Sequence, residues 1–506
     1  MAIRHVEAPV YRNQMPRFEV LSEESLETVE RGWRRLVAEI GVQFDHPQAL
    51  DLFRAAGAQV DHESRVRFDP EFLLEQAGKA PTEFDMRARN PDRDLHIGGD
   101  TMIFAPTQGP PFVRMGGERR DASLADLERF IMLTQAFDEL DTPGGGICEP
   151  NDTPLDSRHL AMNMALITLS DKVFEGVPMS AVAARDSVRM GEILFGGREQ
   201  IEERPVMFAN VNVNSPLRYD VRMLEAMLEF SAANQAVIVT PFLLMGAMAP
   251  VAIGAALAQQ TAEVLAGVAL LQLVRPGCPV VMGSFLSSTD MKSGAPAFGT
   301  PESAIGLYAS GQIARRIGLP WRAGGGTLTA SPAVDAQAGY EALNTLTSAF
   351  LAGANVVWQA AGWLEGGLVA SFEKFMMDVE LLKLLRVQFQ ATEIDEAGLA
   401  FGAHQEVGPG GHFFGCEHTL EHFRDCFYRP FLATTDNFDR WSGKGSRTAA
   451  GRAEGLWREV LERYEPPPLD DAVREELTEF VERRTRELGD EPVRVGIPPA
   501  APPAAA

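Results

Sequence analysis

The glycine-rich segment Gly408 to His422 holds the densest group of chemically active side chains in the sequence. Glycines directly before His412 present an imidazole, a group that can exchange protons near neutral pH. His418 and His422 are four residues apart, so on a helix they would share one face, which is also the spacing of a metal-ligand pair. We expect His412 to contact a substrate, and the later pair to pack within the helix or to face a partner.

A zinc site could be drawn from this histidine pair together with Cys416 or Cys148, and zinc would activate a thiol. However, the sequence has neither a Cys-x-x-Cys pair nor the glutamate of a His-Glu-x-x-His motif. We therefore predict that the protein binds no metal ion, and we keep a zinc-dependent thiol chemistry as an alternative.

Aromatic residues near the predicted strand ends suit a different ligand, a methylated ammonium, because the face of an aromatic ring attracts a cation that cannot hydrogen-bond well. A single aromatic residue at such a place is more often ordinary core. Trp363 differs, since it lies between Gly362 and the turn Glu365-Gly366-Gly367, where burial is less obvious. The candidate aromatic residues are Trp358, Trp363, Phe208, Phe285 and Phe104.

These candidates follow short apolar runs that alternate with longer helical patterns. The runs begin near residues 144, 173, 205, 236, 279, 320, 355 and 399, and several are nearly continuous in apolar residues, as expected of strands buried in a parallel sheet. Eight strand-helix units predict an α/β fold, a (β/α)8 barrel of the TIM type, with a doubly wound sheet as the second choice. In a barrel, reactive groups lie at the carboxyl ends of the strands. The residues that close the runs include Glu149, Glu175, Asn210, Asn212, Met248, Ser284, Thr327 and Gln359.

The Gly324-Gly325-Gly326 run does not indicate a nucleotide site. It lacks the lysine of a phosphate-binding loop and the spacing of a dinucleotide fingerprint. A tight turn at a strand end explains it more simply.

The regions outside the barrel are helical. A helix is predicted from Ser22 to Ile40 and another from Pro47 to Ala56, followed by a hairpin over Thr101 to Arg114 and a helix beginning after Ser123. We assign residues 1–140 to a cap, 141–434 to the barrel, 435–490 to a helical extension and 491–506 to a disordered proline- and alanine-rich tail.

The composition limits the partners. With 46 basic and 70 acidic residues the chain has a formal charge of −24, which repels nucleic acids and anionic lipids. Its most apolar stretch, Pro241 to Ala258, is broken by Pro250 and glycines, so we interpret it as a strand followed by a helix. Four widely spaced cysteines and the lack of a signal peptide predict a cytoplasmic protein that binds neither nucleic acid nor membrane. The sequence leaves a homo-oligomer open.

Four segments, in this order, resemble the trimethylamine methyltransferase family: Gly144 to Glu149, Asp335 to Glu341, Asn355 to Gly367 and Gly408 to Arg424. The resemblance implies a barrel enzyme that moves a methyl group from an amine to the cobalt of a separate corrinoid protein, with no cofactor of its own. Archaeal trimethylamine enzymes carry pyrrolysine at the place held here by Ala333 or Val334. The resemblance therefore points to the branch without pyrrolysine, whose substrates are quaternary amines such as glycine betaine.

A quaternary nitrogen already bears the positive charge that makes its amine a leaving group, so no residue is needed to supply one. On this basis Trp363 and Phe285 would face the cation, with Phe208 and Trp358 as further substrate-binding residues. His412, Asp335 and Tyr340 are the predicted catalytic residues, the last two as orienting groups, and Gln337 would contact the other end of the substrate. The alternatives are a protein that binds methylated amines without turnover and a zinc-dependent thiol methyltransferase.

Overall fold

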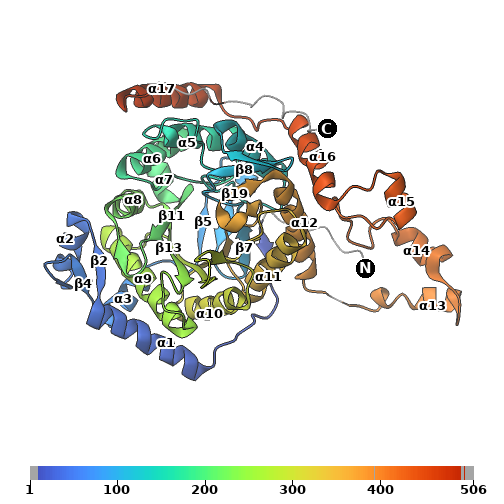
Figure 1. Cartoon of the computed structure of the whole chain (residues 1–506), viewed down its shortest axis with the longest axis horizontal. Coiled ribbons are helices and arrows are strands. Elements are labelled where there is room, and N and C mark those ends of the chain that lie inside the picture. Colours follow the sequence, from blue (N-terminus) through green and yellow to red (C-terminus); the bar gives the residue numbers. More distant parts are fainter. Residues whose placement is uncertain (1–9, 393, 492–494, 496–506) are drawn as a thin grey trace.

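The protein is described here by a computed structural model covering residues 10–392, 394–491 and 495. Its centre is a barrel of parallel strands ringed by helices (Figure 1). The strands follow the order β7-β17-β16-β14-β13-β11-β10, and β1 (Tyr11–Arg12) pairs antiparallel with β7 at one end. The parallel strands are β7 (Thr101–Phe104), β10 (Phe174–Glu175), β11 (Met207–Val213), β13 (Ala236–Met245), β14 (Val280–Thr289), β16 (Trp321–Ala323) and β17 (Val356–Val357).

The segment that begins at Asp141 closes the ring between β7 and β10. The backbone N–H of Asp141 donates to the carbonyl of Phe104 at 2.9 Å, and that of Glu175 donates to the carbonyl of Gly144 at 2.9 Å. This irregular segment occupies the eighth position, so the predicted (β/α)8 barrel is confirmed.

The strand predicted near Leu399 is wrong. That region forms a 3₁₀ turn (Ala397–Leu399) and helix α13 (Phe401–Val407), with the side chains of Leu399 and Phe401 exposed. The barrel instead takes β7 from the region that the sequence assigned to a cap over residues 1–140. All four residues of β7 are buried, which a barrel strand requires.

The hairpin predicted over Thr101 to Arg114 is also wrong. β7 pairs with β17, whereas β8 (Phe112–Met115) joins a separate sheet with β9 (Glu118–Asp121), β19 (Val369–Ser371) and β18 (Trp363–Leu364). Pro106, Pro110 and Pro111 interrupt the chain between the two strands and have no N–H to continue a ladder. The connection bends over the barrel mouth instead.

The barrel helices begin where local capping chemistry allows. Ser123 caps α4 in a reciprocal capping box with Asp126, and Thr300 precedes a proline at the first position of α10, as predicted. The helices around the barrel are α4 (Leu124–Ala136), α5 (Arg158–Leu169), α6 (Ala181–Phe195), α7 (Arg198–Glu203), α8 (Val221–Ala232), α9 (Ile253–Val274), α10 (Pro301–Ile317), α11 (Ala336–Ala352) and α12 (Phe372–Gln388).

Helix α9 is long and apolar enough to cross a membrane, and 89% of its most apolar stretch is buried inside the protein. It follows β13, so the predicted strand and helix around Pro241 to Ala258 are confirmed. A Cβ at Gly32 would lie 2.9 Å from the Cβ of Ala258, which shows how closely the N-terminal helix α1 (Glu23–Arg35) packs on α9. The length and apolarity of α9 therefore match its place as a core helix.

The N-terminal extension covers one side of the barrel. Ser22 caps α1 through the backbone N–H of Ser25, and the helix continues as a π-helix over Leu36–Ile40. The extension also contains α2 (Pro47–Ala55), α3 (Pro70–Ala77), the strands β2 (Val42–Phe44), β3 (Gln59–Val60) and β4 (Arg65–Arg67), and the hairpin of β5 (Phe84–Met86) and β6 (Leu95–Ile97). The loop after β11 adds β12 (Arg218–Tyr219) to the sheet of β2, β3 and β4.

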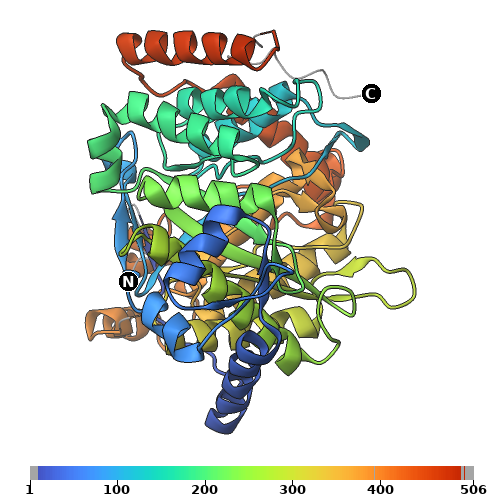
Figure 2. The ribbon, with the colours of Figure 1, turned by 90° about the vertical axis from the view of Figure 1, so that its left-hand side faces the viewer.

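The C-terminal helices pack on the opposite side, with α17 along the top of the molecule and α1 at the bottom in both views (Figures 1 and 2). The indole N–H of Trp457 donates to Glu373 at 3.2 Å, and Arg484 forms an ion pair with the buried Asp186 at 2.9 Å. The helices that make these contacts are α16 (Ala449–Glu462) and α17 (Asp471–Glu487), while α14 (Glu417–His422) and α15 (Phe438–Gly443) extend away from the barrel. The tail predicted from residue 491 lies almost entirely outside the described residues, and the domain limits stay a prediction.

Candidate functional site

A cavity of about 790 Å³ opens at the carboxyl ends of the barrel strands. Each of the eight barrel positions contributes to its lining, as the barrel geometry predicts. Beneath it, apolar side chains that include Phe208, Ile238, Val281 and Trp358 fill the barrel interior. The cavity is therefore a pocket with a packed floor and not a pore.

Glu175, at the end of β10, is the central carboxylate of the cavity and is 4% exposed. Its side chain accepts hydrogen bonds from the Gln108 amide, from the indole N–H of Trp358 at 3.1 Å and from the backbone N–H of Asn210 at 3.3 Å. Burial raises the pKa of Glu175 to about 7, although these donors and the charge of Arg322 act in the opposite direction. A second cation, in addition to Arg322, would therefore be needed to keep the Glu175 carboxylate fully ionised at neutral pH.

Arg322, on β16, is the buried cation of the same cavity and is 1% exposed. Its guanidinium donates to the carbonyl of Ser284 at 3.3 Å and to the side-chain oxygen of Gln359 at 3.0 Å. Its Nε–H is buried without a hydrogen-bond partner in the described structure. Burial lowers the pKa of Arg322 to about 10, and the charge of Glu175 offsets part of this effect. Arg322 therefore remains charged at neutral pH and lacks a full set of acceptors.

Phe242, Phe285 and Trp363 form an aromatic wall on the same cavity. The ring centroids of Phe242 and Phe285 lie 4.8 Å apart, and those of Phe285 and Trp363 lie 6.1 Å apart. Such faces attract a cation that carries methyl groups. The cavity thus combines an aromatic wall, one buried carboxylate and one buried guanidinium.

The triple glycine near residue 325 makes room for this wall. A Cβ at Gly324 would lie 2.5 Å from the Phe285 ring, and one at Gly326 would lie 2.1 Å from the carbonyl oxygen of Gln359. Gln359 itself has a left-handed backbone with φ of 59°, a strained state that is concentrated at functional sites. The glycines therefore permit close packing behind the cavity, which is consistent with the tight turn predicted for them.

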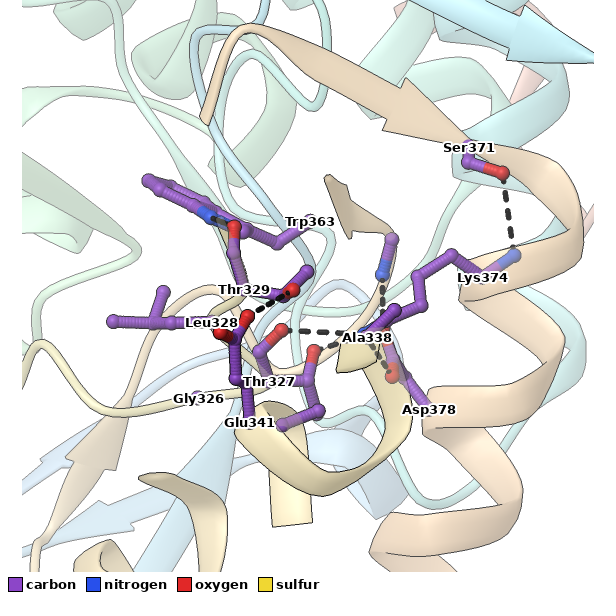
Figure 3. Close-up of polar contacts among 12 residues, drawn as sticks. Gly326, Thr327, Leu328, Thr329, Ala338, Glu341, Trp363, Ser371, Lys374 and Asp378 are labelled. Carbon is purple, nitrogen blue, oxygen red and sulfur yellow. Dashed lines mark hydrogen bonds and ion pairs between the residues drawn. The ribbon is translucent and has the colours of Figure 1, made fainter. Parts of the chain in front are cut away.

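Polar contacts fix the orientation of Trp363 (Figure 3). Its indole N–H donates to the carbonyl of Thr329 at 3.1 Å, and the hydroxyl of Thr329 donates to Glu341 at 2.5 Å. On the other side of the ring, a Cβ at Gly367 would lie 2.5 Å from the indole. The hydrogen bond to Thr329 and the close packing against Gly367 therefore fix the Trp363 ring, and its position does not depend on a bound ligand.

A buried ion pair between Lys374 and Asp378 anchors the turn that carries Trp363. Both side chains lie on α12 and are at most 2% exposed. Asp378 accepts hydrogen bonds at 2.8 Å from the hydroxyl of Thr327 and from the backbone N–H of Gly362 (Figure 3). The pair therefore joins the loop after β16 to the turn after β17.

Another buried carboxylate, that of Glu263 on α9, holds the loop that forms a further part of the cavity wall. It accepts from the hydroxyl of Ser215 at 2.7 Å and from the backbone N–H of Leu217 at 2.7 Å. Asn214, Ser215, Pro216 and Arg218 line the cavity from this loop. Burial raises the pKa of Glu263, opposed by these hydrogen bonds.

The structure brings together four of the five candidate aromatic residues, whereas Phe104 packs against Tyr11 and Phe350. Phe285 and Trp363 line the cavity, while Phe208 and Trp358 lie directly beneath it, with their rings 5.3 Å apart in an edge-to-face contact. Trp358 reaches the cavity through its hydrogen bond to Glu175. Their roles in substrate binding remain predictions.

The other predicted residues lie elsewhere. Asp335 caps α11 by accepting from the N–H of Ala338, Gln337 donates to Glu341 at 2.9 Å, and Tyr340 is 61% exposed. His412 is exposed beyond the barrel, in the segment that leads to α14. The roles predicted for these four residues remain predictions, and none of the four is among the residues that line the cavity.

The sequence predicts no role for two charged residues of the cavity, Glu175 and Arg322. Glu175 belongs to the predicted strand-end residues, whereas Arg322 does not. Each is a single charge within an apolar run, Val173-Phe174-Glu175 and Trp321-Arg322-Ala323. Since charged residues are rarely buried without a partner, this pattern is the signal that could have identified them.

The histidine pair considered for zinc, His418 and His422, is half-buried on α14, with ring centroids 4.7 Å apart. Among the described residues, no group of three or more His, Cys, Asp or Glu side chains is arranged to hold a metal ion. Cys148 is buried, and burial raises the pKa of its thiol.

Comparisons with known proteins agree with one another. The model of the trimethylamine methyltransferase family matches residues 2–489. The chain is 39% identical to a glycine betaine methyltransferase of Desulfitobacterium hafniense, over 94% of this chain and 99% of that protein. It is 29% identical to a proline betaine:corrinoid methyltransferase of Eubacterium limosum, over 75% and 80% of the two chains.

A solved structure shares the fold. The monomethylamine methyltransferase of Methanosarcina barkeri superimposes with a TM-score of 0.52 at 11% identity, over 89% of this chain and 90% of that one. At this identity the likeness concerns the barrel and not the substrate.

Proposed function

Because this chain belongs to the trimethylamine methyltransferase family and is a methyltransferase, we propose that its substrate is a quaternary amine that also carries a carboxylate, as glycine betaine does. The methyl acceptor in this proposal is the Co(I) of a corrinoid held by a separate protein. The names of two relatives, which act on glycine betaine and proline betaine, support this choice.

The observation that carries the proposal is the pairing of opposite charges in one aromatic cavity. Glu175 and Arg322 are both buried, and burial disfavours the charged form of each. A betaine would offer a cation to Glu175 and the aromatic wall, and an acceptor to the unpartnered Nε–H of Arg322. Trimethylamine lacks the second group, so it would leave the Nε–H of Arg322 without an acceptor.

The protein's part in the reaction is to bind, orient and desolvate. Co(I) supplies the electron pair for the new bond to the methyl carbon, while the carbon–nitrogen bond breaks and its pair stays on nitrogen, leaving a neutral tertiary amine. Arg322 would fix the carboxylate end, so that one methyl group is aligned toward the opening of the cavity. Phe242, Phe285 and Trp363 would exclude water from the cation.

The residues found where related enzymes carry pyrrolysine support a substrate whose nitrogen already bears a positive charge. Val334 is partly buried and packs against the cluster of Ala338, Leu364 and Val369. Ala333 and Val334 are small apolar residues that cannot activate an amine.

A direct test mixes the protein with a reduced corrinoid protein and follows the cobalt absorbance after adding each member of a panel. Glycine betaine and proline betaine should give methyl transfer. Choline is the matched control, since it carries the same trimethylammonium group without the carboxylate, and it should react at least tenfold more slowly. Equal rates with choline and glycine betaine would contradict the role of Arg322, and no reaction with any amine would contradict the proposed acceptor.

A further inference from the structure

The segment from Phe401 to Arg447, which we call the arm, lies outside the ring of barrel helices, beyond α12 (Figure 1). It contains α13, a 3₁₀ turn (Phe413–Gly415), α14 and α15. Its attachment to the barrel is at Glu380 of α12, whose carboxylate accepts from the backbone N–H groups of Phe431, Leu432 and Ala433 at 2.8–3.0 Å. Before Tyr428, the hydrogen bonds described for the arm join it to itself or to Ala400.

The arm exposes large apolar side chains to an unusual degree. Nine of its 47 residues, or about 19%, are Phe, Tyr or Trp, whereas these types make up 8% of the whole chain. Its helices are only six or seven residues long, far below the length at which a helix is stable alone in water. The exposed fractions are 87% for Phe414, 77% for Phe427, 73% for Phe438, 68% for Phe401, 59% for Leu420, 52% for Phe423 and 42% for Phe413.

The arm is also nearly neutral within a strongly acidic protein. It carries six acidic and five basic residues, a formal charge of −1, while the whole chain carries −24. Two copies of this chain repel one another over most of their surfaces. The arm is therefore a region where a second copy can approach with little electrostatic opposition, and its aromatic content is that of an interface core.

We propose that the arm packs against a second copy of this chain and that its exposed phenylalanines form the core of a homo-oligomeric interface. A corrinoid protein fits this surface less well. It has to leave after each transfer, which favours a smaller and more polar contact, and none of the residues that line the cavity belongs to the arm. A patch that meets its own copy in a closed symmetric assembly also avoids open-ended aggregation.

The test compares Phe414→Asp/Phe427→Asp with a matched control, Leu155→Asp/Val221→Asp, which adds the same charge at exposed apolar positions outside the arm. Sedimentation velocity across the micromolar range should give the unchanged chain and the control as multiples of 55.2 kDa. The arm variant should sediment as a monomer with unchanged far-UV circular dichroism, its dissociation constant raised at least a hundredfold.

Cross-linking of a mixture of light and heavy isotope-labelled copies gives a second readout that needs no variant. Cross-links between light and heavy chains should map to the arm. A monomeric unchanged protein, an arm variant that keeps its oligomer, or arm cross-links that form only to an added corrinoid protein would each overturn the proposal. Because none of these measurements uses methyl transfer, their outcome is independent of the proposed substrate.

Discussion

The binding of a betaine should depend on pH through Glu175. In the free cavity, burial raises the pKa of this carboxylate to about 7, so near neutral pH about half of the molecules hold it protonated. A quaternary ammonium beside it favours the ionised form and lowers its pKa. Binding at acidic pH therefore releases a proton, and the affinity rises with pH until Glu175 is ionised in the free protein as well.

The size of the effect follows from the free pKa. If the ligand binds the ionised form alone, the dissociation constant is about twofold weaker at pH 7 and about tenfold weaker at pH 6 than on its plateau above pH 8. Near pH 6 close to one proton is released for each betaine bound. Both quantities come from isothermal titration calorimetry with glycine betaine, repeated in two buffers of different ionisation enthalpy.

Two variants test whether the proton released on betaine binding comes from Glu175. Glu175→Gln should bind more weakly at pH 8 and should show no dependence on pH between 6 and 8. Glu149→Gln is the matched control, since Glu149 is a second carboxylate on the cavity but lies 3.6 Å from Arg158 and is partly exposed. It should keep the tenfold change. A flat profile in the unchanged protein, or a tenfold change that survives in Glu175→Gln, would refute the reasoning.

Four further substitutions test the remaining predictions. Arg322→Gln should raise the KM for glycine betaine at least thirtyfold, corresponding to about 2 kcal/mol for a buried charged contact, and should narrow its preference over choline in steady-state assays; an unchanged preference would remove the carboxylate contact. Trp363→Ala should weaken betaine binding about tenfold in calorimetry, whereas the exposed His412→Ala should leave it unchanged, and the reverse result would favour the role predicted from sequence. Asp378→Leu should lower the free energy of unfolding by about 3 kcal/mol in urea, because it leaves the Lys374 ammonium buried alone, and a loss below about 1 kcal/mol would show that the pair does not anchor the turn.

The cavity shows where sequence reasoning reached the site and where it stopped. Phe285 and Trp363 could be predicted because barrel geometry places strand ends together, and that rule needs only the order of strands along the chain. Glu175 and Arg322 could not be paired in the same way. A sequence does not show that two charges on different strands are desolvated in one cavity, and this desolvation is what gives them their chemistry.

The errors in the fold have a similar cause. β7 has only four residues, so it carries too little periodicity to be separated from one arm of a hairpin. Its identity as a barrel strand depends on a partner far away in the chain, through the pairing of Ile103 with Val356. The run near Leu399 had the local composition of a strand but no place in the ring.

The sequence alone determined the α/β class, the barrel, the start of helices such as those after Ser22 and Ser123, and the family, because alternation, capping and family motifs are local features of the chain. Only the tertiary structure decided which strands close the barrel, which charges share the cavity and which phenylalanines are left exposed on the arm. Burial and long-range pairing are properties of the folded chain, and no local pattern encodes them.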